Sequence, residues 1–147
     1  MTRFTEISTD LWIHCRFCAI MQKKQSEEQR MKLRYMIIGA GGVGGPVGAY
    51  LSKSGADTTL IARGKHLAVL QEHGLTLVSG EKERESIPVK AIDMDGFLAA
   101  REQGAPAPDV IFVCVKGYSL ADTVPFIRKA AGRDTVVIPV LNIYGTG

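Results

Sequence analysis

The chain has 147 residues, 46% hydrophobic and 22% charged, which suits one buried core and does not suit a collagen-like, disordered or disulfide-built protein. Its formal net charge of +3 arises within residues 1–34, which hold seven Lys and Arg against four Asp and Glu, whereas residues 35–147 hold eleven of each. Residues 35–147 thus have no net charge, which argues against a nucleic-acid-binding protein and against binding to a membrane surface.

The chain has three cysteines, Cys15, Cys18 and Cys114. This low and odd number argues against a disulfide framework and fits a reducing compartment. No apolar run has the roughly 18–20 residues of a transmembrane helix. His14 and Arg16 interrupt the most apolar N-terminal stretch, so no signal peptide is expected. We therefore expect a cytoplasmic protein. Cys15 and Cys18 lack the second pair of ligands that a structural zinc needs, and no metal site is expected.

Residues 1–30 differ in pattern from the rest of the chain. Their apolar positions keep neither a helical nor a strand period, and residues 22–30 (QKKQSEEQR) form a solvated charged run. Met31 stands directly before the first regular strand. We interpret residues 1–30 as an extension, non-native or flexible, and residues 31–147 as one domain. A real helix that packs on the domain or on a partner is the alternative.

From residue 35 onward, short apolar strands alternate with helices. In chain order the patterns predict a strand over 35–38, a helix ending near 54, a strand over 58–62, a helix over 65–72, a hairpin of 75–78 with 86–92, a short helix over 93–100, a strand over 110–115, a helix over 120–131 and a strand over 135–140. In the helix over 65–72, Leu67, Leu70 and Val69 are expected to face inward. The alternation predicts an α/β, Rossmann-like, doubly wound and mostly parallel sheet with helices on both faces.

The segment from Gly39 to Gly44 reads GAGGVG and lies between a predicted strand and a predicted helix. The first glycine would allow the tight turn, Gly41 would let the backbone approach a pyrophosphate, and Gly44 would let the helix pack closely on the sheet. The helix N-terminus would offer free N–H groups to the phosphates. We predict a dinucleotide site made by Gly39, Ala40, Gly41, Gly42, Val43 and Gly44. A glycine-rich turn that binds nothing is the alternative.

The end of the second strand indicates which dinucleotide is bound. Sites selective for NAD place an Asp or Glu there, to accept a hydrogen bond from the ribose 2′-hydroxyl. This strand ends in Arg63, followed by Lys65, with no carboxylate. Arg63 could pair with a 2′-phosphate through charge-assisted hydrogen bonds, so the predicted cofactor is NADP. The alternative is an ordinary exposed arginine that opens the next helix.

Four segments together resemble the ketopantoate reductases (2-dehydropantoate 2-reductases). They are the GAGGVG loop, residues 60–64 (LIARG), residues 113–116 (VCVK) and residues 140–146 (VLNIYGT). The resemblance covers about residues 31–147, the N-terminal domain of that family. It implies NADPH-dependent reduction of a small 2-keto acid, 2-dehydropantoate, to pantoate on the route to coenzyme A.

By the same resemblance, Lys116 would lie by the cofactor and the substrate, and Asn142 would contact the nicotinamide ribose and the substrate. Both follow predicted parallel strands, beyond whose carboxyl ends ligands bind. The alternatives are a lysine in solvent and an asparagine in an ordinary turn. Cys114, flanked by valines, is expected to belong to the core.

The family's lysine general acid and its acidic substrate-binding partner lie in a C-terminal helical domain that has no match in these 147 residues. No catalytic residue is therefore assigned, and we expect the chain to bind cofactor without turning over substrate. Two alternatives stay open: the N-terminal domain of another 2-keto or 2-hydroxy acid dehydrogenase, and a non-catalytic dinucleotide-binding module. An exposed apolar sheet edge or domain interface would favour a homodimer.

Overall fold

The computed structural model describes residues 32–79 and 83–141 of the chain. In chain order its elements are β1 (Arg34–Ile38), α2 (Gly44–Lys53), β2 (Asp57–Ile61), α3 (Gly64–His73), β3 (Leu75–Ser79), β4 (Glu83–Ile87), β5 (Lys90–Ile92), α4 (Met94–Glu102), β6 (Val110–Val113), the 3₁₀ helix η1 (Gly117–Ser119), α5 (Leu120–Ala130) and β7 (Val136–Pro139). The predicted extension over residues 1–30, Cys15 with Cys18, and Asn142 all lie outside the described residues. Among the described helices, none combines the length and the apolar character needed to cross a membrane.

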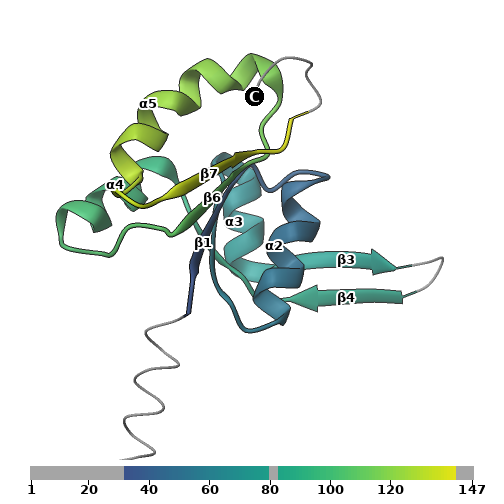
Figure 1. Cartoon of the computed structure of the whole chain (residues 1–147). Helices are drawn as coiled ribbons and strands as arrows, with labels where there is room; N and C mark the ends of the chain where they lie inside the picture. Colours follow the sequence, from purple (N-terminus) through teal and green to yellow (C-terminus); the bar gives the residue numbers. More distant parts are fainter. Residues whose placement is uncertain (1–31, 80–82, 142–147) are drawn as a thin grey trace, which may run out of the picture. The chain divides into compact units, whose positions relative to one another are not determined.

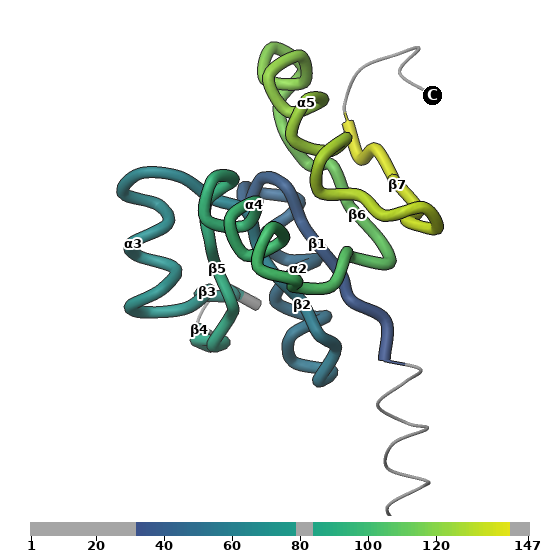
Figure 2. Tube along the Cα trace, turned by 90° about the vertical axis from the view of Figure 1, so that its left-hand side faces the viewer, coloured from purple at the N-terminus to yellow at the C-terminus, as the bar shows by residue number. Residues whose placement is uncertain are grey.

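Five strands form one parallel sheet in the order β5-β2-β1-β6-β7 (Figures 1 and 2). The central strand β1 pairs with β2 on one side and β6 on the other, and Ile38 is level with both Ile61 and Val113. The chain therefore winds outward from β1 in both directions, and the strand order reverses between β1 and β6. This arrangement confirms the predicted Rossmann-like α/β fold.

The two faces of the sheet carry different helices. Leu60 and Ala62 pack with Leu70 of α3, and a Cβ on Gly48 of α2 would meet the Leu60 side chain, so α2 and α3 lie on one face. On the other face, Met36 and other strand residues pack against α4 and α5. Phe97 of α4 and Phe126 of α5 contact each other edge to face, with ring centroids 6.0 Å apart. Right-handed crossovers that leave β1 in opposite directions require this division of the helices.

The helix α3 corrects one sequence prediction. Leu70 is 2% exposed and Leu67 is partly buried, as predicted, but Val69 is 50% exposed. A helix turns by about 100° per residue, so a stripe that buries Leu67 and Leu70 leaves their neighbour Val69 on the outer side. The prediction that Val69 faces inward was therefore wrong.

The segment from Ser86 to Ile92 corrects a second prediction, because it forms two strands instead of one. β3 and β4 pair antiparallel as the predicted hairpin. β5 is not part of that hairpin and pairs with β2 in the main sheet. Pro88 stands between them. Proline has no N–H to donate to a ladder and favours a strand end, so the chain can change sheets at this position.

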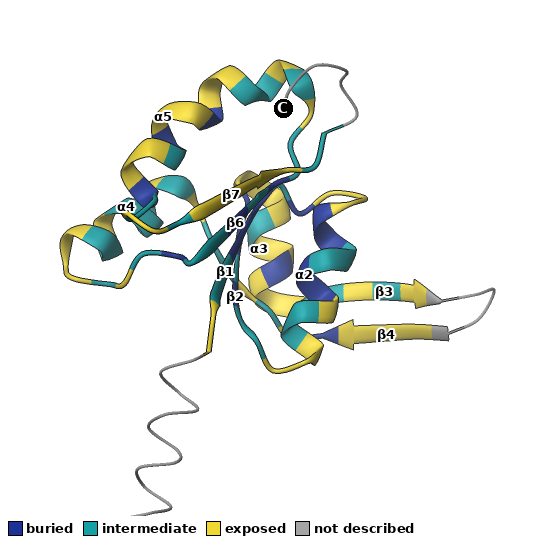
Figure 3. Cartoon of the chain, viewed as in Figure 1, coloured by how far each residue is buried: buried dark blue, intermediate teal, exposed yellow. Residues whose placement is uncertain are grey.

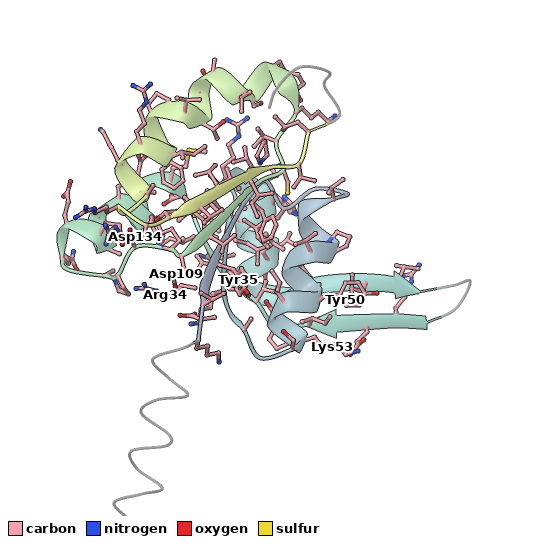
Figure 4. All side chains as sticks on the ribbon, in the orientation of Figure 1. Arg34, Tyr35, Tyr50, Lys53, Asp109 and Asp134 are labelled. Carbon is pink, nitrogen blue, oxygen red and sulfur yellow. The ribbon has the colours of Figure 1, made fainter. Side chains whose placement is uncertain are left out.

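Arg34 and Asp109 connect the amino-terminal ends of β1 and β6 (Figure 4). The Arg34 guanidinium donates from Nε to Asp109 Oδ2 at 2.9 Å and from Nη2 to Oδ1 at 2.8 Å. The Arg34 backbone N–H donates to the same carboxylate at 2.8 Å, and the Asp109 N–H returns a bond to Arg34 O at 2.9 Å. The hydrogen bonds from Arg34 hold the pKa of the Asp109 carboxyl below its usual range.

This lowered pKa predicts an acid-dependent loss of stability. Because the carboxylate has a lower pKa in the folded than in the unfolded chain, its contribution is complete above the unfolded value near 4 and is lost as the pH falls through the folded value. Asp109→Asn should therefore cost about 1 kcal/mol at pH 7, a small amount because the pair is one-third exposed. Below pH 4 the parent and the variant should converge in urea-unfolding experiments.

Asp134→Asn is the matched control, because Asp134 is exposed and accepts no side-chain hydrogen bond within the part of the chain that the structure describes. It should leave the pH profile of the parent unchanged. A gap between the parent and Asp109→Asn that stays constant from pH 7 to pH 2 would contradict the ionic role given to Asp109.

Candidate functional site

Two loops meet at the carboxyl edge of the sheet. The loop after β1 begins at Gly39, whose N–H donates to Ile61 O of β2 at 3.2 Å. The loop after β6 begins at Cys114, whose N–H donates to Ile38 O of β1 at 2.8 Å. The strand order reverses between β1 and β6, and in open α/β sheets ligands bind outside the strand ends at such a point. The predicted glycine motif therefore lies where a ligand crevice is expected.

Two glycines of the motif are required by the protein's own packing. Gly39 has a φ of +95°, and a Cβ on it would come within 2.8 Å of Cys114 O. A Cβ on Gly44, the first residue of α2, would lie 2.0 Å from Gly39 O and 2.9 Å from the Cys114 Cβ. These two glycines let the chain turn sharply and let α2 begin directly against β1 and β6. Ala40, between them, is 7% exposed and packs in the core.

The packing of the described residues does not require glycine at the other two positions, Gly41 and Gly42. A Cβ on Gly41 or Gly42 would have no atom within 4 Å, and both residues are exposed. Neither has a positive φ. Within the described part of the chain, the backbone N–H groups of Gly41, Gly42 and Val43 donate to no backbone oxygen. The loop thus presents unpaired donors to an open space immediately before a helix N-terminus.

The surroundings of this open space are positive. The first turn of α2 carries no acidic residue. Arg63 directly precedes α3 in an extended conformation and is exposed, as are Lys65 in the first turn of α3 and Lys116 after β6. Arg63 and Lys65 follow β2 and Lys116 follows β6, the two strands that flank β1. With the partial positive charge of the α2 N-terminus, they form an edge suited to an anionic ligand.

One carboxylate follows β5 at this edge, but it already has a partner. The Asp93 side chain accepts a hydrogen bond from the Gly96 N–H at 2.7 Å and so caps α4. Its position next to β2 was not singled out from the sequence. The spacing of Asp93 and Gly96 before a helix is the signal that could have assigned this capping role.

Sequence reasoning also missed the structural part that Cys114 plays. Its carbonyl oxygen lies against Gly39 and its side chain against Gly44, so it forms the wall on which the glycine turn rests. Cys114 is half-buried and stands outside both core clusters, and so the prediction of a core residue was only partly right. Burial raises the pKa of its thiol. Tyr118, 80% exposed on η1 after Lys116, is a second residue that the sequence did not bring forward.

Residues 35–146 match the family described as ketopantoate reductase PanE/ApbA. The chain belongs to the ketopantoate reductase family. A 2-dehydropantoate 2-reductase from Mesorhizobium japonicum is 32% identical over 111 residues, which are 75% of this chain and 32% of that protein. The chain spans about a third of the length of the curated relatives it matches.

Solved structures of the family have the same fold. A PanE/ApbA family ketopantoate reductase from Ralstonia eutropha JMP134 is 25% identical with a TM-score of 0.64, over 75% of this chain and 34% of that one. A dimeric ketopantoate reductase from Staphylococcus aureus is 29% identical with a TM-score of 0.53, over 78% of this chain and 38% of that one. The similarity covers about three quarters of this chain and about a third of each relative.

Proposed function

We propose that the chain is the NADP(H)-binding domain of an oxidoreductase that reduces a 2-keto acid, as the 2-dehydropantoate 2-reductases of its family do by name. The observation that carries the proposal is the open space over Gly41 and Gly42. Neither the backbone conformation of these two residues nor their packing requires glycine. The missing side chains leave room for a ligand to approach the backbone. The pyrophosphate of a dinucleotide is the group that fits unpaired N–H groups at a helix N-terminus.

The choice of NADP over NAD rests on Arg63. It lies beyond the carboxyl end of β2, next to the strand that carries the glycine loop, which is the position of the ribose-binding residue in this fold. A guanidinium can bind a 2′-phosphate through two parallel hydrogen bonds. Lys65 adds positive charge one residue into α3.

When bound, the nicotinamide supplies the hydride for the keto carbon. In this proposal Lys116, exposed after β6, binds both the cofactor and the carboxylate end of the substrate. Asn142 is proposed for the nicotinamide ribose and the substrate; it follows Leu141 by one residue and lies outside the described residues. No residue of this chain is assigned as the proton donor, and cofactor binding without turnover remains our expectation for the 147 residues alone.

The proposal is tested by replacing Gly41 with valine and titrating with NADPH, following nucleotide fluorescence. The added side chain would occupy the space proposed for the pyrophosphate, and we expect at least a 10-fold loss of affinity, equivalent to about 1.4 kcal/mol. The thermal midpoint should change by less than about 2 °C, because a Cβ at this position meets no atom of the protein.

Ala99→Val is the matched control, since Ala99 is exposed on α4, away from the glycine loop. It adds similar bulk and should leave NADPH affinity within 2-fold of the parent, a change of roughly 0.4 kcal/mol. NADPH affinity that survives in a folded Gly41→Val variant would refute the pyrophosphate site. A parent chain that binds neither NADPH nor NADH would refute the proposed function itself.

A further inference from the structure

The helix α3 (Gly64–His73) has one side against the sheet and one side in solvent, a contrast that Figure 3 shows. Leu67 and Leu70 pack against the strands, whereas Val69 is 50% exposed. Between these two sides the helix has two flanks, and a hydrogen bond identifies one of them. Gln71 Nε2 donates to Ala91 O of β5 at 3.0 Å, so the flank that carries Gln71 lies next to β5.

The Gln71 flank of α3 faces the outer edge of the sheet. β5 is the terminal strand at one end of the described sheet, and it pairs with β2. Ile92 O of β5 accepts from the Ala62 N–H, so this carbonyl points toward β2. Successive carbonyls of a strand point in opposite directions, and Ala91 O therefore points away from β2. The opposite flank of α3 faces the other way, toward β1 and the helix α2 that packs on β1 and β2.

His66 lies on this second flank. It precedes Gln71 by five residues, and at about 100° per residue the two side chains are about 140° apart around the helix axis, with the buried Leu67 and Leu70 between them. His66 also belongs to the first turn of α3, and the Cα–Cβ bonds of a helix tilt toward its N-terminus. That end of α3 follows β2 at the carboxyl edge of the sheet. His66 therefore faces the space between the starts of α2 and α3.

This space is where a dinucleotide on the glycine loop would place its adenosine ribose. In this fold the pyrophosphate lies at the glycine turn, and the ribose 2′-oxygen lies at the end of the second strand. Arg63 stands at that strand end, about one helical turn before His66. Building on the proposed function, we infer that His66 is a second residue that contacts the 2′-phosphate of NADP(H). Its imidazole donates an N–H to a phosphate oxygen and so favours NADPH over NADH.

The surroundings of His66 agree with this role. Its side chain is exposed and makes no hydrogen bond within the part of the chain that the structure describes. The first turns of α2 and α3 carry no acidic residue that would compete for the imidazole N–H. A phosphate has three acceptor oxygens and can accept from Arg63 and His66 together. Lys65 lies four residues before the exposed Val69, on the outer side of α3, so the contact is assigned to His66.

The test titrates the 147-residue chain and its His66→Ala variant with NADPH and NADH, following nucleotide fluorescence. NADPH affinity should fall by about 5-fold in the variant, as for the loss of one hydrogen bond to a charged group at an exposed site. NADH has no 2′-phosphate, so its affinity should stay within about 2-fold of the parent. His66→Gln keeps an N–H donor at this position and should bind NADPH more tightly than His66→Ala.

His73→Ala is the matched control. His73 is an exposed histidine at the other end of α3, seven residues after His66 and therefore on the same flank about two turns away. Its loss should leave both affinities within about 2-fold of the parent. A direct measurement uses adenosine 2′,5′-bisphosphate, which has the 2′-phosphate but no nicotinamide. In NMR spectra this compound should shift the imidazole signals of His66 and leave those of His73 in place.

The outcomes separate this inference from the proposed function. If the parent binds NADPH and His66→Ala binds it equally well, His66 makes no contact with the 2′-phosphate, while the cofactor site stands. Equal losses of NADPH and NADH affinity in His66→Ala, or imidazole signals of His66 that do not respond to adenosine 2′,5′-bisphosphate, would also overturn the inference alone. A parent that binds neither nucleotide would overturn both.

Discussion

Replacing Gly44 with alanine is expected to destabilise the domain by about 3 kcal/mol, at the upper end of the usual cost of overpacking. The new Cβ would lie 2.0 Å from Gly39 O and 2.9 Å from the Cys114 Cβ. Neither neighbour can move easily, because both are held by backbone hydrogen bonds. The Gly39 N–H donates to Ile61 O of β2, and the Cys114 N–H donates to Ile38 O of β1. With a total stability of about 5–15 kcal/mol, the thermal midpoint should fall by more than about 10 °C.

Gly41→Ala is the matched control for this experiment, with the same substitution three residues earlier in the same loop. Its Cβ would meet no atom within 4 Å, and so thermal unfolding should be close to that of the parent. The pair of variants separates the two reasons for glycine in this motif, since one position serves packing and the other is proposed to serve the ligand. Equal midpoints for Gly44→Ala and the parent, followed by circular dichroism, would contradict the close contact between α2 and β1.

Arg63→Asp should reduce NADPH affinity by about 10- to 100-fold, the effect of losing a charge-assisted pair worth about 1.5–3 kcal/mol and placing a carboxylate near the phosphate. NADH has no 2′-phosphate, so its affinity should change by less than about 3-fold, or less than 1 kcal/mol. The parent should accordingly prefer NADPH, and the variant should lose or reverse that preference. Fluorescence titration with both nucleotides measures the two affinities.

Arg84→Asp provides the control for charge, because Arg84 is an exposed arginine on β4, outside the main sheet. The same change of two charge units there should leave the preference between the nucleotides within about 2-fold of the parent, since salt screens distant charges. Equal affinities of the parent for NADPH and NADH would remove the role proposed for Arg63. If Arg63→Asp weakened the binding of NADPH and NADH equally, Arg63 would contact a part of the cofactor that both nucleotides share.

The local pattern of the chain was enough to predict most of the elements. The apolar run before Gly39, the glycines themselves and the helix that ends before Gly55 follow from preferences that act within a few residues. These parts agree because short-range sterics and hydrogen bonding decide them before any distant segment is in contact.

Tertiary contacts decided what the local pattern left ambiguous. The apolar run of residues 135–140 predicts a strand, but whether a neighbour covers it depends on sheet order, and β7 is exposed at the edge. The split at Pro88 likewise depends on β5 finding β2 as its partner. Neither outcome has a signature within a few residues, because pairing between strands joins segments far apart in the chain.

The amino-acid sequence by itself determined the α/β alternation, the glycine turn and the position of Arg63 at a strand end, because each depends on residues adjacent in the chain. Only the tertiary structure separated Gly39 and Gly44, which pack against Cys114 and each other, from Gly41 and Gly42, which face open space. All four look alike in sequence. What distinguishes them is the distance to Cys114, the residue after β6 and about 70 residues further along the chain, and only folding sets that distance.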